Sequence, residues 1–77
     1  MNKAEFLDMI REVMDREEEL KEEMLLEDVE EYDSLAALSL MAMFDEYGID
    51  VSPKTFEELK TVRDLVDLAM RGIINEG

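Results

Sequence analysis

Residues 31–48 read EYDSLAALSLMAMFDEYG, and their pattern is that of one helix with both of its ends. Residues 34–44 contain no charge, glycine or proline, and they are rich in Ala, Leu and Met, which favour helices. Asp33 or Ser34 can cap the start of this helix, and Gly48 can end it in the left-handed conformation that glycine tolerates. The pattern predicts a helix over residues 34–47. Because it is apolar almost all round, it should be buried on several sides or face a partner.

Three more helices are predicted on either side of this stretch. Ser52 followed by Pro53 is typical of the start of a helix, here a short one, and Thr61 with Asp64 predicts a capping box for the last helix. Gly72 is expected to end that last helix and leave residues 73–77 as a frayed tail. The apolar positions with helical spacing are Phe6, Leu7, Ile10, Val13 and Met14 in the first helix, Phe56 and Leu59 in the short one, and Val62, Leu65, Val66, Ala69 and Ile73 in the last.

A long connector separates the first two main helices. Its acidic run, residues 17–23, is read either as a prolongation of the first helix or as a solvated segment, because like charges disfavour close packing. Four apolar residues further along the connector do not recur at a helical or strand spacing. They are interpreted as side chains that attach the connector to the core: Met24, Leu25, Leu26 and Val29. The predicted fold is therefore all-α: a small four-helix bundle of three main helices and one short helix, with a long first connector, in a single domain over residues 1–77.

The composition excludes several classes of function. Twenty-two acidic and eight basic residues give a formal charge of −14, which repels nucleic acids and anionic lipid surfaces, so no nucleic acid partner is expected. Without cysteine or histidine the chain has no disulfide, thiol nucleophile, thiolate metal site or imidazole base. No run approaches the roughly 18 apolar residues of a membrane span, so we expect a cytoplasmic monomer without membrane insertion.

Neither the carboxylates nor the methionines indicate a specific site. The spacing of Asp45, Glu46, Gly48 and Asp50 does not match a calcium loop, so we expect no metal site, only loose cation binding. The numerous carboxylates are interpreted as a solvated face, because nothing in the sequence builds the desolvated cleft that acid–base catalysis needs. The seven methionines are interpreted mainly as core filling.

The remaining candidate is Asp33-Ser34-Leu35, where the acidic connector meets the uncharged helix. For any Asp-Ser at a helix start, simple capping is the more common explanation. A serine at this position nevertheless projects toward the unpaired N–H groups and the helix dipole, which favour a phosphate ester. Since the chain has no histidine or cysteine to activate Ser34, another enzyme must perform any covalent chemistry there. Ser34 is thus a candidate attachment point, and no residue is predicted to be catalytic.

Over nearly its whole length the chain resembles the acyl carrier protein family. The resemblance rests on the order of the helices, the acidity, Asp33-Ser34-Leu35, residues 45–49 (DEYGI) and residues 61–66 (TVRDLV). It implies that Ser34 carries 4'-phosphopantetheine taken from coenzyme A, whose thiol holds an acyl or aminoacyl group as a thioester. It also implies two kinds of partner: a phosphopantetheinyl transferase, and acyltransferases, synthases or ligases with basic or apolar docking surfaces. The expected partner-binding residues are Asp33, Leu35, Asp45 and Glu46.

Two departures from the family pattern favour a specialised carrier. Glu31 stands where the family usually has glycine, three residues before the serine. Fatty-acid carriers commonly place acids early in the second helix, whereas this chain has Ala36, Ala37 and Ser39 there. A basic enzyme patch would meet these uncharged side chains instead of carboxylates, which favours a specialised lipid or secondary-metabolite pathway over general fatty acid biosynthesis.

A second hypothesis comes from a different functional class. The chain could be an acidic protein-interaction module that docks through its Met- and Leu-rich second helix, with Ser34 only capping that helix. Treatment with a broad phosphopantetheinyl transferase distinguishes this module from a carrier. An autonomous serine hydrolase ranks third, because the chain has no histidine to act as the base.

Overall fold

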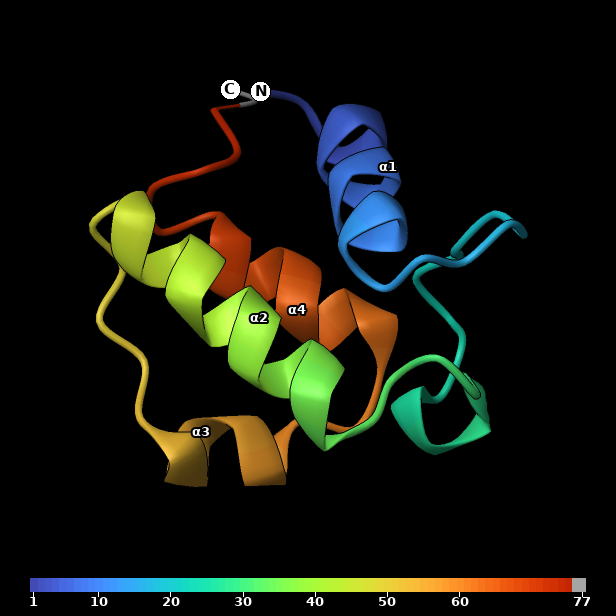
Figure 1. Ribbon diagram of the computed structural model, residues 1–77. Helices are drawn as coiled ribbons and strands as arrows, with labels where there is room; N and C mark the ends of the chain where they lie inside the picture. The colour runs from blue at the N-terminus through green and yellow to red at the C-terminus, as the bar shows by residue number, and fades with distance from the viewer. Residues whose placement is uncertain (76–77) are drawn as a thin grey trace.

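The computed structural model describes residues 1–75, which form a small bundle of four α-helices (Figure 1). The elements are α1 (Lys3–Val13), the 3-10 turn η1 (Leu26–Asp28), α2 (Ser34–Glu46), α3 (Pro53–Glu58) and α4 (Val62–Ala69). Within these residues there is no β-strand, only an isolated antiparallel bridge between Leu25 and Thr61. The predicted all-α fold with one short helix and a long first connector is confirmed.

The three main helices pack together, and the short helix closes one end. α1 packs against both α2 and α4. In Figure 1, α2 and α4 run in the same direction, and α3 lies across the end of the bundle at which α2 begins. Residues 1 and 75 meet at the opposite end, where the Asn75 N–H donates to the Met1 carbonyl at 2.9 Å (Figure 1). None of the helices described here is both long and apolar enough to cross a membrane.

Three phenylalanines from different helices form the centre of the core. The ring of Phe44 lies 6.1 Å from that of Phe6 and 5.9 Å from that of Phe56, centroid to centroid, in tilted and edge-on contacts that aromatic pairs favour. Every buried side chain in the described part of the chain is hydrophobic. The other buried residues are Ile10, Met14, Leu20, Leu26, Val29, Ala36, Leu40, Met43, Ile49, Val62, Leu65, Val66, Leu68, Ala69, Ile73 and Ile74.

Two helices end in the same backbone motif. At the end of α2 the N–H of Gly48 donates to the carbonyl of Asp45 and that of Ile49 to the carbonyl of Phe44, which is a Schellman motif with Gly48 at φ 81°. At the end of α1, Asp15 takes the left-handed position at φ 56°. The acidic run therefore does not prolong the first helix: the chain turns at Asp15 and continues as a connector.

The start signals for α3 and α4 are confirmed. The Ser52 hydroxyl accepts from the Thr55 N–H, and Thr61 and Asp64 form a reciprocal capping box. The backbone N–H groups of Lys60 and Thr61 donate to the Asp64 carboxylate, and these bonds hold the pKa of Asp64 below its ordinary value. The sequence reading missed a second capping box, between Asn2 and Glu5 at the start of α1.

The prediction of a frayed C-terminal tail is wrong for residues 73–75. α4 ends at Ala69, before Gly72, and the chain folds back so that the N–H groups of Ile73 and Ile74 both donate to the Ala69 carbonyl. Both isoleucine side chains are buried because they complete the core beside the N-terminus. The rest of the predicted tail, residues 76–77, lies outside the described residues.

The prediction that apolar residues attach the connector to the core is confirmed for Met24, Leu26 and Val29 and is wrong for Leu25. Leu26 and Val29 are buried and Met24 is half-buried, whereas Leu25 pairs with Thr61 in the β-bridge and has an exposed side chain. The Leu26 N–H donates to the Lys60 carbonyl at 2.8 Å, and the Val62 N–H donates to the Met24 carbonyl at 3.0 Å. These bonds tie the connector to the segment between α3 and α4.

Candidate functional site

Ser34 is the first residue of α2, and the cap of that helix is Asp33. The Asp33 Oδ1 atom accepts from the Ala36 N–H at 2.9 Å, so the carboxylate performs the capping that the sequence left open between two residues. Ser34 is exposed, and its hydroxyl makes no hydrogen bond with any other residue in the described range. The hydroxyl is therefore accessible to another enzyme.

The electrostatic surroundings of Ser34 suit a phosphate ester. The first N–H groups of a helix have no intrahelical acceptor, and the helix dipole adds partial positive charge there. No acidic residue lies in the first turn of α2 itself, although the Asp33 cap is adjacent. A phosphodiester on Ser34 would thus lie beside backbone donors.

An open groove of about 560 Å³ begins at Ser34 and runs between α2 and α3. From α2 it is lined by residues at helical spacing, Ser34, Leu38 and Met41, so the serine and the apolar side chains share one row. This groove was not predicted from the sequence, where only the helical spacing of Ser34, Leu38 and Met41 indicates it. The other lining residues are Tyr32, Asp33, Ala37, Pro53, Phe56 and Glu57.

The groove is a surface feature that does not continue into the core. Leu40 and Phe44, which face the bundle from α2, are fully buried and do not line it. Tyr32 lies at the same end of the groove as Ser34 and is half-buried, and this burial raises the pKa of its phenol. The site can therefore shield an apolar group next to Ser34 without opening the bundle.

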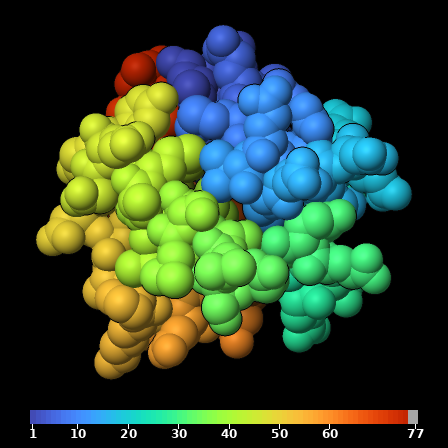
Figure 2. Space-filling model, viewed as in Figure 1, coloured from blue at the N-terminus to red at the C-terminus, as the bar shows by residue number. Residues whose placement is uncertain are grey.

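The outer face of α2 is apolar near Ser34 and acidic at its far end. Leu35 and Leu38 are 73 % and 60 % exposed, and Figure 2 shows the green to yellow-green side chains of α2 on the face turned to the viewer. The expectation that Ala36 meets a partner is wrong, because Ala36 is buried against the core. Ala37 is half-buried, so of the three early uncharged positions only Ser39 is fully exposed.

The structure brings two of the predicted partner-binding residues to Ser34 and leaves the other two apart. Asp33 and Leu35 are its chain neighbours and are exposed. Asp45 and Glu46 lie exposed in the last turn of α2, which is about 16 Å further along the helix at 1.5 Å per residue. The two pairs therefore lie at opposite ends of α2.

A comparison with protein families matches most of the chain to a known family. The family model described as the phosphopantetheine attachment site matches residues 4–69. The chain belongs to this family. It is therefore a carrier protein of the class that bears the 4'-phosphopantetheine prosthetic group. No curated protein and no solved structure matches the chain.

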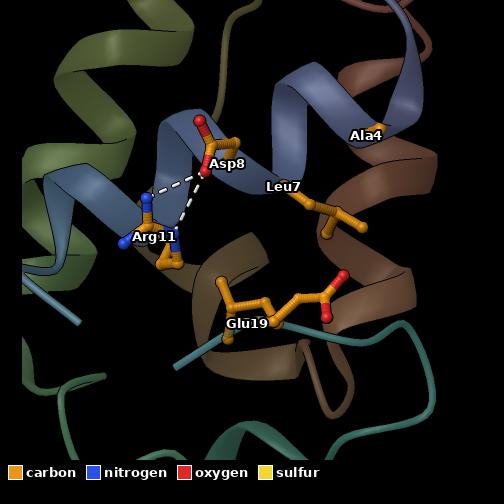
Figure 3. A pocket seen from close by; sticks show the side chains of 6 residues that line it. Ala4, Leu7, Asp8, Arg11 and Glu19 are labelled. Carbon is orange, nitrogen blue, oxygen red and sulfur yellow. Dashed lines mark hydrogen bonds and ion pairs between the residues drawn. The ribbon is translucent and has the colours of Figure 1, made fainter. Parts of the chain in front are cut away.

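The described residues also form a smaller hollow away from Ser34. This hollow, about 160 Å³, lies between α1 and the start of the connector, where Leu7, Arg11 and Glu19 are among the lining residues (Figure 3). Arg11 is already satisfied there, because its guanidinium donates to Asp8 Oδ1 at 2.9 and 3.1 Å and to the Arg16 carbonyl at 2.7 Å. Among residues 1–75, no cluster of three or more acidic side chains is arranged to hold a metal ion.

Proposed function

We propose that this carrier is an acyl carrier protein that holds acyl or aminoacyl thioesters on a 4'-phosphopantetheine arm attached to Ser34. One observation carries the assignment: an exposed serine begins α2, its hydroxyl has no capping role, and it opens directly onto an apolar groove. Family membership supplies the prosthetic group. The exposed position of Ser34 beside the groove supports it as the residue that carries this group.

In this proposal Ser34 contributes only its hydroxyl oxygen to the attachment reaction. The oxygen attacks phosphorus in the diphosphate of coenzyme A, a P–O–P bond breaks, and the nucleotide portion leaves. In this proposal the transferase supplies the base that takes the proton, because Asp33, the carboxylate adjacent to Ser34, caps α2. The carrier itself is non-catalytic, and the sulfur that holds the cargo belongs to the arm.

In this proposal the groove binds the arm or the cargo atoms next to the thioester. Leu38, Met41 and Phe56 offer apolar contact within a volume of about 560 Å³. An apolar thioester that lies there removes surface from water, which stabilises it by about 25 cal/mol per Å². The carrier can thus hold an apolar cargo loosely and release it to an enzyme.

The α2 face beside Ser34 is the proposed docking surface, on a carrier that acts as a monomer. Leu35 and Leu38 give apolar contact, while Asp33 near the serine and Asp45 with Glu46 at the far end supply charges that guide encounter. The matching partners are a phosphopantetheinyl transferase and acyltransferases, synthases or ligases with an apolar docking recess bordered by basic groups. This surface suits a specialised lipid or secondary-metabolite pathway.

The test is the mass of the intact protein after incubation with coenzyme A and a broad phosphopantetheinyl transferase. The wild-type chain and Ser39→Ala should each gain one phosphopantetheinyl group, and Ser34→Ala should gain none. Ser39 is a matched control, because it is exposed on the same helix little more than one turn further on. Modification at Ser39 or Ser52, or no modification at all, would remove the assignment of Ser34.

The exposure of Leu35 and Leu38 also supports the second hypothesis, an acidic interaction module that docks through α2. The same experiment separates the two. An unmodified wild-type chain that retains its helical circular dichroism would favour the module, whereas a single addition lost in Ser34→Ala favours the carrier.

A further inference from the structure

Arg16 is the centre of a set of contacts within the acidic connector. Residues 15–33 contain eleven acids and only two bases, Arg16 and Lys21. The Arg16 Nη1 atom lies 2.7 Å from Glu31 Oε1, Nη2 lies 3.5 Å from Glu18 Oε2, and Nε donates to the Glu18 carbonyl at 3.1 Å. With its side chain only 11 % exposed, Arg16 is far less solvated than an ordinary surface arginine.

Backbone hydrogen bonds position Arg16 independently of the contacts that its side chain makes. Arg16 follows the left-handed residue Asp15, and its N–H donates to the Arg11 carbonyl at 3.0 Å as part of the Schellman motif. Its own carbonyl accepts from the Arg11 guanidinium at 2.7 Å. The arginine is therefore fixed to the end of α1, and its side chain reaches across to a residue 15 positions later in the chain.

Glu31, the partner of Arg16, belongs to the turn that leads into Ser34. The Tyr32 N–H donates to the Val29 carbonyl at 3.0 Å, and the Asp33 N–H donates to the Glu31 carbonyl at 3.1 Å. This turn sets the position of Tyr32 in the groove and of the Asp33 carboxylate that caps α2. The hydrogen bond from Arg16 also holds the pKa of Glu31 below its ordinary value, so the pair is ionised at neutral pH.

We propose that Arg16 and Glu31 form a positioning clamp that holds the turn before Ser34 in the conformation the transferase recognises. This inference rests on the proposed attachment at Ser34 and adds two residues that do not touch the prosthetic group. Without the clamp, Glu18 and Glu31 lose the cation between them, and the turn populates other conformations. A partner that binds one conformation then binds with an apparent affinity reduced by the fraction still in that conformation.

The test compares Glu31→Gln with Glu30→Gln in the full chain. Both variants remove one negative charge from neighbouring positions, but Glu30 is exposed and its side chain makes no hydrogen bond or ion pair within the described residues. Glu31→Gln should raise the KM for the carrier in the transferase reaction roughly three- to tenfold with kcat unchanged, as expected from a reduced competent fraction. Glu30→Gln should match the wild type. Arg16→Gln should reproduce the effect of Glu31→Gln, and the double variant should be no worse than either single one.

A second measurement does not depend on the transferase. Amide hydrogen exchange of the unmodified protein should be faster in Glu31→Gln than in Glu30→Gln at Tyr32, Asp33 and Ala36, with the core amides of α4 unchanged. Equal KM values and equal exchange in the two variants would overturn the clamp while leaving Ser34 as the attachment site. A wild-type chain that is not modified at all would instead refute the proposed function, and the exchange measurement alone would then decide whether the clamp exists.

Discussion

Asp33 and Ser34 have separate roles although they are neighbours at the start of α2. The Asp33 carboxylate bonds to the helix backbone, so the Ser34 hydroxyl is left exposed and without a hydrogen-bond partner in the described structure. If Ser34 were the cap instead, its oxygen would be directed at the helix N–H groups and would be less accessible as a nucleophile. Because the Asp33 carboxylate caps the helix, the Ser34 hydroxyl is left available as an attachment point.

Asp64 gives a prediction at the same scale for pH dependence. Its folded pKa lies below its ordinary value of 3.8, so the stabilisation from its backbone hydrogen bonds is present above that pH and is lost as the pH falls through the folded value. At neutral pH, Asp64→Ala should be less stable than Asp67→Ala by about 0.3–1 kcal/mol, toward the lower end because the group is largely solvated. Denaturant unfolding measured between pH 7 and pH 2 checks this.

Asp67→Ala is the control for Asp64→Ala, because it removes an exposed aspartate from the same helix. The difference between the two variants should shrink once the pH falls below 3.8, since the protonated carboxyl accepts the N–H bonds poorly. A difference that stays constant down to pH 2 would show that the charge of Asp64 plays no part.

At the scale of elements, α2 combines three surfaces on one short helix. Leu40 and Phe44 are fully buried in the core, Ser34 and Met41 line the groove, and Leu35 is exposed on the outer face. Residues 34–44 carry no charge, so no charged side chain of this segment has to stay solvated. Each of the three sides of the helix can therefore be covered by apolar groups. The exposed leucine face costs solubility unless a partner covers it, which agrees with a helix used for docking.

The end of α1 carries a prediction about backbone strain. Asp15 occupies the left-handed position of a Schellman motif at φ 56°, where glycine is the preferred residue. Asp15→Gly should be more stable than Asp15→Ala by about 1 kcal/mol, because alanine suffers strain from its Cβ atom at this φ. Both variants lose the same charge, so urea unfolding of the pair isolates the backbone effect. Equal stabilities would contradict the left-handed turn.

At the scale of the whole molecule, repulsion between like charges opposes a small core. The chain carries a net charge of −14 within a radius of gyration of 11.3 Å. The Debye length at 0.1 M salt is about 10 Å, so at lower ionic strength the charges repel one another across the entire bundle. A domain of this size buries a limited apolar area, and its stability margin is correspondingly small.

Salt should therefore raise the melting temperature. For a domain of this size, each 1 kcal/mol gained in the free energy of unfolding raises the melting temperature by about 4–8 °C. Magnesium chloride should act at lower concentration than sodium chloride, because divalent ions gather loosely around so many carboxylates even though residues 1–75 contain no ordered three-ligand site. Calorimetry over a range of ionic strengths tests the first statement, and a comparison of the two salts at matched ionic strength tests the second. A melting temperature indifferent to salt between low and physiological ionic strength would contradict this account.

The sequence alone determined the features that depend on residues within about one helical turn of each other. The Ser52 cap, the Thr61 and Asp64 box, the left-handed Gly48 and the start of α2 are local in this sense, and each was predicted. The candidate serine also followed from its neighbours, because a helix start can be read from the local sequence pattern.

Tertiary structure decided everything that joins distant segments. Arg16 meets Glu31 across 15 residues, the groove needs α3 beside α2, and Ile73 and Ile74 are buried because the tail returns to the N-terminus. No local pattern distinguishes a buried tail from a frayed one, or an arginine in a clamp from an arginine in solvent. The physical reason is that these contacts depend on which apolar surfaces are covered together when the whole chain packs, and the free energy of that packing is shared among residues far apart in the sequence.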